Sequence, residues 1–332
     1  VVLRTHRLNA GKLVHNVSFE LRKGEILGFA GLIGAGRTET ARAIFGADPI
    51  QSGWIEVNGR RVRINSPQDA VAKGIGYLSE DRKRFGLAVN LCLRDNIVMA
   101  SYDQFTRGLF VDAKKAEDVT EHYIERLRIK TPSVDQLIRN LSGGNQQKVV
   151  IAKWLICNCE ILIFDEPTAV LTPQEIDFLL DIIKSLRDDG KTIILITHKL
   201  EEIKRIADRC AILNHGRLMD VMDVATTSTK VMANKMVGRE VNFETEKEPA
   251  KPGKTILDIQ HLNVYNKQDF QVVKDVSLEV HSGEIVAIAG VAGNGQVEIA
   301  DAIAGLIPAR SGKILLNGRD ITDLSIRERT TE

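Results

Sequence analysis

One stretch of the sequence has the residue types and the spacing to bind a phosphate group. Residues 31–38 read GLIGAGRT, a glycine-rich loop that precedes a segment with helical spacing. In such a loop the backbone N–H groups and the following helix N-terminus point towards an anion, and a threonine hydroxyl can reach Mg²⁺. Arginine stands where this motif usually carries lysine, and its planar guanidinium can also pair with phosphate oxygens. We interpret the loop as a phosphate site comprising Gly31, Gly34, Ala35, Gly36, Arg37 and Thr38.

Acidic and histidine residues end two apolar runs further along the chain. One run ends in Asp165 and Glu166, and another ends in Thr197 and His198. Beside bound phosphates, Asp165 would bind Mg²⁺ together with Thr38, and Glu166 would polarise the attacking water as a general base. Each feature alone is common in proteins as a tight turn or a strand end. The function of these residues therefore depends on the other motifs that accompany them.

These residues need strands and helices that bring distant segments together. Short apolar runs predict buried strands, and helical spacing of apolar residues predicts helices. The predicted strands are 26–30, 161–164 and 192–196, and the predicted helices are 37–45, 112–129 and 174–187. Strands that alternate with helices at this spacing indicate a parallel sheet covered by helices, so the fold class is α/β. The amphipathic helix at 112–129 is expected in a helical subdomain.

The chain contains an internal repeat of domain size. Residues 16–62 align without gaps on residues 275–321, which indicates a tandem duplication and not a solenoid array. Between the copies, a charged stretch with two prolines and a glycine predicts a linker. We expect a first domain at 1–238 with a helical subdomain at about 85–157, a linker at 239–254, and the N-terminal part of a second domain at 255–332.

The glycine-rich loop of the second copy departs from the phosphate-binding pattern. It carries Gln296 where the first copy has Arg37, and Val297 where the first copy has Thr38. Glutamine brings no charge to the phosphates, and valine offers no oxygen to Mg²⁺. We therefore expect a degenerate site that binds nucleotide without hydrolysing it, through Gly290, Gly293, Gly295 and Gln296.

Composition and charge limit the classes of function. The 45 Lys and Arg residues nearly balance the 44 Asp and Glu residues, so no nucleic-acid partner is expected. No apolar run reaches the roughly 20 residues that span a bilayer, and the first residues show no signal pattern. We expect a cytoplasmic protein whose membrane association comes through a partner, with its four cysteines reduced.

A third motif connects these features to a known family. Residues 141–148 read LSGGNQQK, and residues 161–168 read ILIFDEPT. This pair resembles the signature sequence and the Walker B strand of ABC ATPases. The resemblance implies that the signature binds the γ-phosphate in the phosphate loop of an opposite cassette, through Ser142, Gly143, Gly144 and Asn145. It also implies that His198 contacts the γ-phosphate, and that Glu80 replaces the Q-loop glutamine of the region that meets a membrane subunit.

The resemblance implies a fold, cofactors and partners. The fold would be a P-loop NTPase ABC cassette followed by a partial second cassette, and the cofactors would be ATP and Mg²⁺. The expected partners are membrane permease subunits and, through them, a periplasmic or extracellular substrate-binding protein. A second cassette, in cis or in a dimer, would complete the site. The expected location is the cytoplasmic face of the cell membrane.

The transported substrate and the rate of hydrolysis are open at this point. The early part of the first copy resembles ribose-type sugar importers, and its later part and the second copy resemble nucleoside-type importers. A sugar of the ribose, galactose or xylose type is the favoured substrate, and a nucleoside is the alternative. A regulatory cassette with little hydrolysis is a rival function, because both phosphate loops depart from the usual motif. A soluble ABC protein acting on ribosomes or DNA would need basic insertions or a coiled coil between the motifs, and none is visible.

Overall fold

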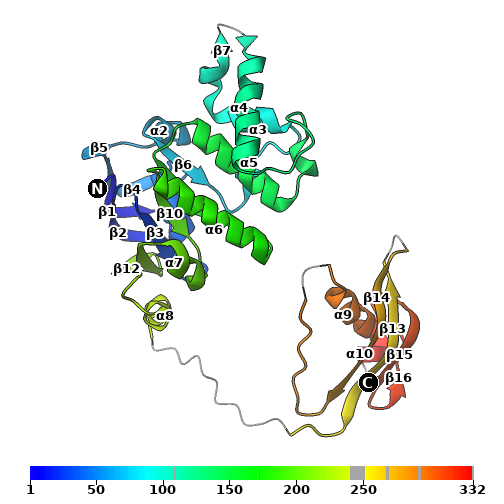
Figure 1. Ribbon diagram of the computed structural model, residues 1–332. Coiled ribbons are helices and arrows are strands. Elements are labelled where there is room, and N and C mark those ends of the chain that lie inside the picture. The colour runs from blue at the N-terminus through cyan, green and yellow to red at the C-terminus, as the bar shows by residue number, and fades with distance from the viewer. Residues whose placement is uncertain (108–109, 170, 240–250, 267–268, 291–292, 331–332) are drawn as a thin grey trace. The chain divides into compact units, whose positions relative to one another are not determined.

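The chain forms two compact units, residues 1–242 and 243–332. The computed structural model describes residues 1–107, 110–169, 171–239, 251–266, 269–290 and 293–330 (Figure 1). Most of the predicted linker, residues 240–250, lies outside the described residues. Each unit is therefore described by itself.

A six-stranded sheet forms the centre of unit 1. Its strand order is β12-β11-β3-β10-β9-β6, and only β12 is antiparallel to its neighbour. Every residue of β3, β6, β9 and β10 is buried, as expected for parallel strands covered on both faces. The three predicted strands are confirmed. The strands are β3 (Ile26–Ala30), β6 (Ile75–Leu78), β9 (Ile161–Asp165), β10 (Thr192–Ile196), β11 (Arg209–Asn214) and β12 (Arg217–Asp223).

An antiparallel sheet of four strands packs in the same hydrophobic core. Its order is β2-β1-β4-β5, with β1 (Leu3–Ala10), β2 (Val14–Leu21), β4 (Ile50–Val57) and β5 (Arg60–Val62). The alternating burial along β2 shows that one face of this sheet is packed and the other meets solvent. Phe19 of β2 contacts Phe29 of β3 edge to face, with ring centroids 4.9 Å apart. The two sheets therefore share one core.

Helices flank the central sheet. The predicted helices at 37–45 and 174–187 are confirmed as α1 (Arg37–Ile44) and α6 (Pro173–Asp188). A capping box starts α6, because the Thr172 hydroxyl accepts the Glu175 N–H while the Glu175 carboxylate accepts the Thr172 N–H. The other helices are α2 (Pro67–Ala72), α7 (Leu200–Ile206) and α8 (Thr229–Val237).

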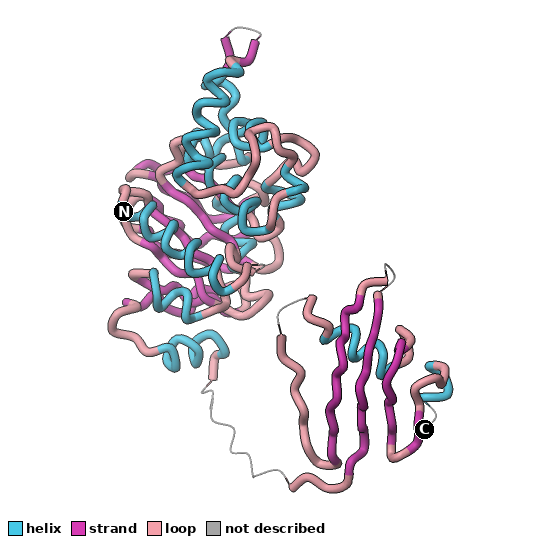
Figure 2. Tube along the Cα trace, turned by 45° about the vertical axis from the view of Figure 1, so that its right-hand side comes forward, coloured by secondary structure: helices cyan, strands magenta, loops and turns pink. Residues whose placement is uncertain are grey.

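A helical subdomain lies between β6 and β9 in the sequence. Its elements are η1 (Arg82–Gly86), α3 (Leu93–Val98), η2 (Met99–Phe105), β7 (Thr106–Arg107), β8 (Phe110–Val111), α4 (Ala113–Arg126), η3 (Ile138–Asn140) and α5 (Gly143–Ile156). The amphipathic helix predicted at 112–129 is α4, which projects away from the sheets with β7 and β8 near its tip (Figures 1 and 2). Ala116 and Thr120 are buried on its inner face.

Unit 2 repeats the antiparallel part of unit 1. Its sheet order, β14-β13-β15-β16, corresponds to β2-β1-β4-β5, and α9 packs on this sheet. The counterpart of β3 is different: residues 284–290 form no strand, and Ile285 is 86% exposed. The elements are β13 (Thr255–Tyr265), β14 (Gln271–His281), α9 (Gln296–Ala304), β15 (Ala309–Leu316), β16 (Arg319–Asp320) and α10 (Ile326–Thr330).

Two polar contacts tie α5 to the segment that follows β6. The buried Lys153 ammonium donates to the carbonyl oxygen of Gly86, and Arg82 Nε donates to Gln146 Oε1 at 3.2 Å. Burial lowers the pKa of Lys153 to about 8. The contact of Lys153 with Gly86 therefore places a charge in a desolvated position between α5 and η1.

We expect Lys153→Met to change how stability depends on pH. Because the pKa of Lys153 falls from 10.5 to about 8 on folding, the unfolded chain binds more protons between these values, and stability rises with pH there. From about pH 7.5 to about pH 9.5, the free energy of unfolding of the wild type should increase by about 1–2 kcal/mol relative to the variant. Urea unfolding at the two pH values measures this change.

The control for this experiment is Lys184→Met, which alters an exposed lysine on α6. Its stability relative to the wild type should not change between the two pH values. A constant difference for Lys153→Met as well would contradict a desolvated Lys153.

Candidate functional site

The phosphate loop of unit 1 joins β3 to α1, and its path requires glycine. Gly34 and Gly36 have φ angles of 79° and 90°, in the left-handed region that side chains with a Cβ atom disfavour. A Cβ atom on Gly36 would lie 2.1 Å from the carbonyl oxygen of Leu13. The N-terminus of α1 therefore faces an open space next to the loop, as an anion site requires.

That space is a cavity of about 280 Å³. Eight of the predicted site residues line it: Gly34, Ala35, Gly36, Arg37, Thr38, Glu80, Glu166 and His198. Gly31, at the start of the loop, is packed too closely for a side chain. A Cβ atom there would clash with Ala35 and with the carbonyl of Leu213. The structure thus brings together residues that are far apart in the sequence.

Thr38 and Asp165 meet at the floor of the site. The Thr38 hydroxyl donates to Asp165 Oδ1 at 3.0 Å, and the Tyr77 hydroxyl donates to Asp165 Oδ2 at 2.7 Å. Burial raises the pKa of Asp165 to about 6, while these two hydrogen bonds act in the opposite direction. A divalent cation would stabilise the ionised carboxylate, and hydroxyl and carboxylate oxygens are ligands that Mg²⁺ prefers. The residues present therefore fit a magnesium ion.

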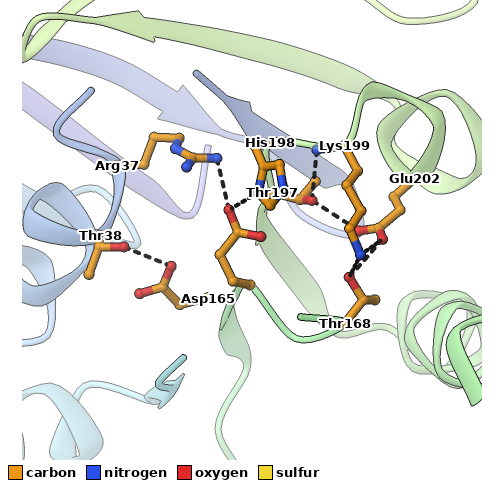
Figure 3. A network of polar contacts seen from close by, with 9 residues as sticks. Arg37, Thr38, Asp165, Thr168, Thr197, His198, Lys199 and Glu202 are labelled. Carbon is orange, nitrogen blue, oxygen red and sulfur yellow. Dashed lines mark hydrogen bonds and ion pairs between the residues drawn. The ribbon is translucent and has the colours of Figure 1, made fainter. Parts of the chain in front are cut away.

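Glu166 lies in the cavity between Arg37 and His198. Its Oε1 atom is 3.1 Å from Arg37 Nη1 and 2.9 Å from His198 Nδ1, and both Glu166 and Arg37 have side chains that are 7% exposed. Figure 3 shows Arg37 and His198 directed towards the same point. Arg37 Nη1 and Glu166 Oε2 make no hydrogen bond despite their burial. Such buried polar atoms are costly to leave unpaired, so the site is built for a further polar ligand.

A second network of hydrogen bonds and ion pairs lies beside His198 (Figure 3). The buried Glu202 carboxylate accepts hydrogen bonds from Thr168 at 2.6 Å and from Thr197 at 3.0 Å. Lys199 Nζ donates to the Thr168 hydroxyl at 3.2 Å and lies 3.4 Å from Glu202. This network joins the loop after β9 to the end of β10 and the start of α7, and thereby fixes the segment that carries His198.

The sequence analysis missed Tyr77 and Glu202. Tyr77 lies in the apolar strand β6, where nothing in the local sequence marks it as a partner of Asp165. Glu202 carries a weak signal, because it lies in the first turn of the helix that follows His198, where acidic residues are common. Its burial depends on contacts with Thr168 and Thr197, which are distant along the chain or belong to another element.

The signature residues lie on a different surface of unit 1. Ser142 caps α5 by accepting the Asn145 N–H at 3.4 Å, and the Asn145 amide also donates to the Ser142 hydroxyl at 3.1 Å. Ser142, Gly144 and Asn145 line a second cavity, and Gly143 is the first residue of α5. Within one unit, the structure does not bring these residues into the cavity of the phosphate loop.

Two glycines in the loop of unit 2 have backbone angles like those of their counterparts in unit 1. Gly293 and Gly295 have φ angles of 89° and 94°, and α9 begins at Gln296. A Cβ atom on Gly290 would lie 2.0 Å from Gln296 Nε2, so the glutamine side chain folds back over Gly290. The Val297 side chain is 67% exposed, and residues 291–292 lie outside the described residues.

Comparison with known proteins identifies the fold and the family. The ABC transporter family model matches residues 14–169 and 273–332. Among solved structures, an ATP-binding cassette of an ABC transporter in its ADP conformation superimposes with a TM-score of 0.59 at 18% identity, over 72% of this chain and 99% of that one. A dimeric cassette bound to ADP and phosphate gives a TM-score of 0.58 at 19% identity, over 67% of this chain and 98% of that one. The predicted fold class is confirmed.

Curated relatives include import proteins of two kinds. The putative ribose/galactose/methyl galactoside import ATP-binding protein 1 of Burkholderia lata is 49% identical over 234 residues, which are 70% of this chain and 46% of that protein. The nucleoside import ATP-binding protein NupA of Lactococcus lactis is 40% identical over 316 residues, which are 95% of this chain and 61% of NupA. The chain thus spans about half the length of the sugar-import relatives.

Among the described residues, none of the helices has the length and apolar character needed to cross a membrane.

The family match covers both copies of the repeat, including the phosphate loop of unit 1 and the segment of unit 2 that contains Gln296. The chain therefore belongs to the ABC transporter family.

Proposed function

We propose that this chain is the ATP-binding and ATP-hydrolysing part of an ABC import system for a sugar of the ribose, galactose or xylose type. The observation that carries the proposal is the convergence of Arg37, Thr38, Glu166 and His198 on one cavity, with Asp165 hydrogen-bonded to Thr38. Phosphoryl transfer to water requires groups of these kinds: a basic group, a hydroxyl beside a carboxylate, and a second carboxylate beside a histidine.

Each residue has a distinct part in the proposed reaction. The backbone of the phosphate loop and the Arg37 guanidinium would hold the phosphates of ATP, and Thr38 and Asp165 would hold Mg²⁺. The bound cation supplies neutralisation of the developing charge. Glu166 would orient the attacking water and accept its proton. His198 would contact the γ-phosphate from the same side as Glu166, because its Nδ1 atom lies within hydrogen-bond distance of that carboxylate.

The location of the signature supports a requirement for a second cassette. Ser142 and Asn145 line a cavity that does not contain the phosphate loop, so they can serve a nucleotide only when another cassette presents one. The opposite cassette would be supplied in cis or by a dimer. We place membrane permease subunits near Glu80, with the chain at the cytoplasmic face of the membrane and a substrate-binding protein on the other side. Nucleic acid has no part in this function.

The two units have unequal parts in this proposal. Unit 1, which contains the first domain at 1–238, would carry hydrolysis. The second domain at 255–332, after the linker at 239–254, would bind nucleotide through its glycine-rich loop without hydrolysing it. Gln296 and Val297 support this division, because they lack the charge and the hydroxyl of Arg37 and Thr38.

Nucleoside import is the second candidate function. Its support is the match to NupA, which extends over 95% of this chain and therefore includes both units. The sugar-import relatives match a shorter part of the chain at higher identity, 49% over 234 residues. Uptake of radiolabelled ribose, galactose, xylose and adenosine by cells with and without the gene would separate the two substrates.

We expect Glu166→Gln to abolish MgATP hydrolysis by the purified chain without abolishing nucleotide binding. The amide cannot accept a proton from water, so kcat should fall by about 100-fold or more. Phosphate release measures turnover, and titration with a fluorescent ATP analogue measures binding in the same samples. Binding without turnover in both proteins would favour a regulatory cassette, and no binding in either would refute the proposal.

We expect Glu202→Gln to lower kcat for MgATP hydrolysis by about 10-fold, with little change in KM. Thr168 and Thr197 donate to different oxygens of the carboxylate, and glutamine replaces one of these oxygens with an NH2 group that cannot accept a hydrogen bond. The segment that carries His198 therefore loses its fixed position. Steady-state kinetics separates kcat from KM. Glu201→Gln, on the exposed face of the same helix, is the matched control and should keep wild-type rates. A wild-type kcat in both variants would show that Glu202 is not needed to position His198.

A further inference from the structure

Two groups that the proposed reaction needs for different tasks are paired with each other in the site. Arg37 would bind phosphate and Glu166 would activate water, yet Arg37 Nη1 lies 3.1 Å from Glu166 Oε1. Both side chains are 7% exposed, so bulk water does not screen this pair. The Glu166 oxygen that faces Arg37 also contacts the His198 ring at 2.9 Å. That oxygen is therefore occupied before any water can use it.

The backbone of Glu166 is fixed next to this pair. Glu166 has a φ angle of 44°, in the left-handed region that non-glycine residues rarely adopt. Its N–H donates to the carbonyl oxygen of Ile196 at 2.9 Å, which anchors the residue to the end of β10. Because the backbone is fixed on this side, the pair can separate only through movement of the two side chains.

The pair is incomplete in comparison with a structural pair in the same unit. Arg209 contacts both oxygens of the buried Glu25, with Nη2 at 2.6 Å from Oε1 and Nε at 2.9 Å from Oε2. Arg37 instead makes a single ion pair without hydrogen-bond geometry, and Glu166 Oε2 has no hydrogen-bond partner. Bidentate contacts are the strong arrangement for a guanidinium and a carboxylate. The contact of Arg37 with Glu166 is therefore the one that a better anionic ligand can displace.

A phosphate group is such a ligand. It offers several anionic oxygens to the planar guanidinium, and the adjoining loop directs the N-terminus of α1 towards the same cavity. A lysine at this position would present one compact charge. It lacks the planar set of N–H donors with which a guanidinium can bind either a carboxylate or a phosphate. Arginine is thus suited to alternate between the two anions.

We propose that Arg37 is a positioning residue that holds Glu166 Oε1 in the nucleotide-free site and releases it when the phosphates of ATP take the guanidinium. This inference rests on the proposed function and adds a regulation of the same site. Oε1 of the general base is freed from Arg37 only when the substrate is bound, so Arg37 couples binding to activation.

The test is a double-mutant cycle on binding of AMP-PNP, which is not hydrolysed. The four proteins are the wild type, Glu166→Gln, Arg37→Gln and the double variant, where Arg37→Gln introduces the residue that unit 2 has at the aligned position. The neutral amide of the Glu166→Gln variant cannot compete for the guanidinium, so this change should tighten binding by about 10-fold where Arg37 is present. In the Arg37→Gln background the same change should alter the Kd by less than about 2-fold.

The alternative explanation is that the Glu166 charge repels phosphate directly, without Arg37. That alternative predicts the same tightening in both backgrounds, and this result would overturn the inference. Glu166→Asp provides a second variant, because it keeps the charge but withdraws the carboxylate from Arg37. Tighter AMP-PNP binding by Glu166→Asp supports the inference, and unchanged or weaker binding contradicts it.

Controls separate this inference from the proposed function and from changes in assembly. Glu25→Gln neutralises a buried carboxylate that is paired with an arginine elsewhere, and it should leave the Kd for AMP-PNP unchanged. Gel filtration and thermal melting confirm that all variants are folded and share one assembly state at the concentration used. Absence of AMP-PNP binding in every protein would refute the proposed function, whereas binding without coupling would refute this inference alone.

Discussion

The position of the functional side chains in unit 1 depends on the hydrogen-bonded register of three parallel strands. Ile196 of β10 lies opposite Asp165 of β9 on one side and opposite Phe29 of β3 on the other. Parallel strands end at the same edge of a sheet, and ligands of open α/β sheets bind outside this edge. The phosphate loop, Glu166 and Thr197 each follow one of these strands, so they meet there. A slip of one residue would turn Asp165 to the opposite face of the sheet and separate it from Thr38.

The register also explains the unusual backbone of Glu166. The hydrogen bond from its N–H to Ile196 extends the pairing of β9 and β10 by one residue beyond Asp165, and the chain then turns with a positive φ angle. Conformations of this kind cost about 1–3 kcal/mol and persist only where the surrounding structure determines them. In this site the two buried strands supply that constraint. The backbone position of Glu166 is therefore a property of the sheet and not of the local sequence.

Sequence reasoning reached three buried strands and three helices of unit 1, namely β3, β9, β10, α1, α4 and α6, because their periodicity is local. It also reached Thr38, Asp165, Glu166 and His198, since each directly follows or begins a recognisable element. Tyr77 and Glu202 were beyond its reach, because both owe their role to hydrogen bonds with segments that are remote in sequence or in another element. The pairing of Arg37 with Glu166 was also not predictable. A guanidinium suits a carboxylate and a phosphate equally well, and only the tertiary structure shows which anion it faces.

Unit 2 shows which parts of the site are local and which are not. Residues 285–289 align with β3 and have a similar apolar sequence, but they form no strand in the described part of unit 2. In unit 1, β3 is paired by β10 and β11, which come from later in the chain. An apolar run becomes a strand only when partners satisfy its backbone N–H and C=O groups.

The glycine-rich loops behave differently. Gly36 and Gly295 have φ angles of 90° and 94°, and a helix begins directly after each of them. The left-handed glycine before the helix is therefore present with or without the adjoining strand, because glycine readily adopts positive φ angles. The chemical difference between the two units then comes from the side chains on a common backbone. Arg37 can exchange between Glu166 and phosphate, whereas Gln296 has no charge with which to take part in such an exchange.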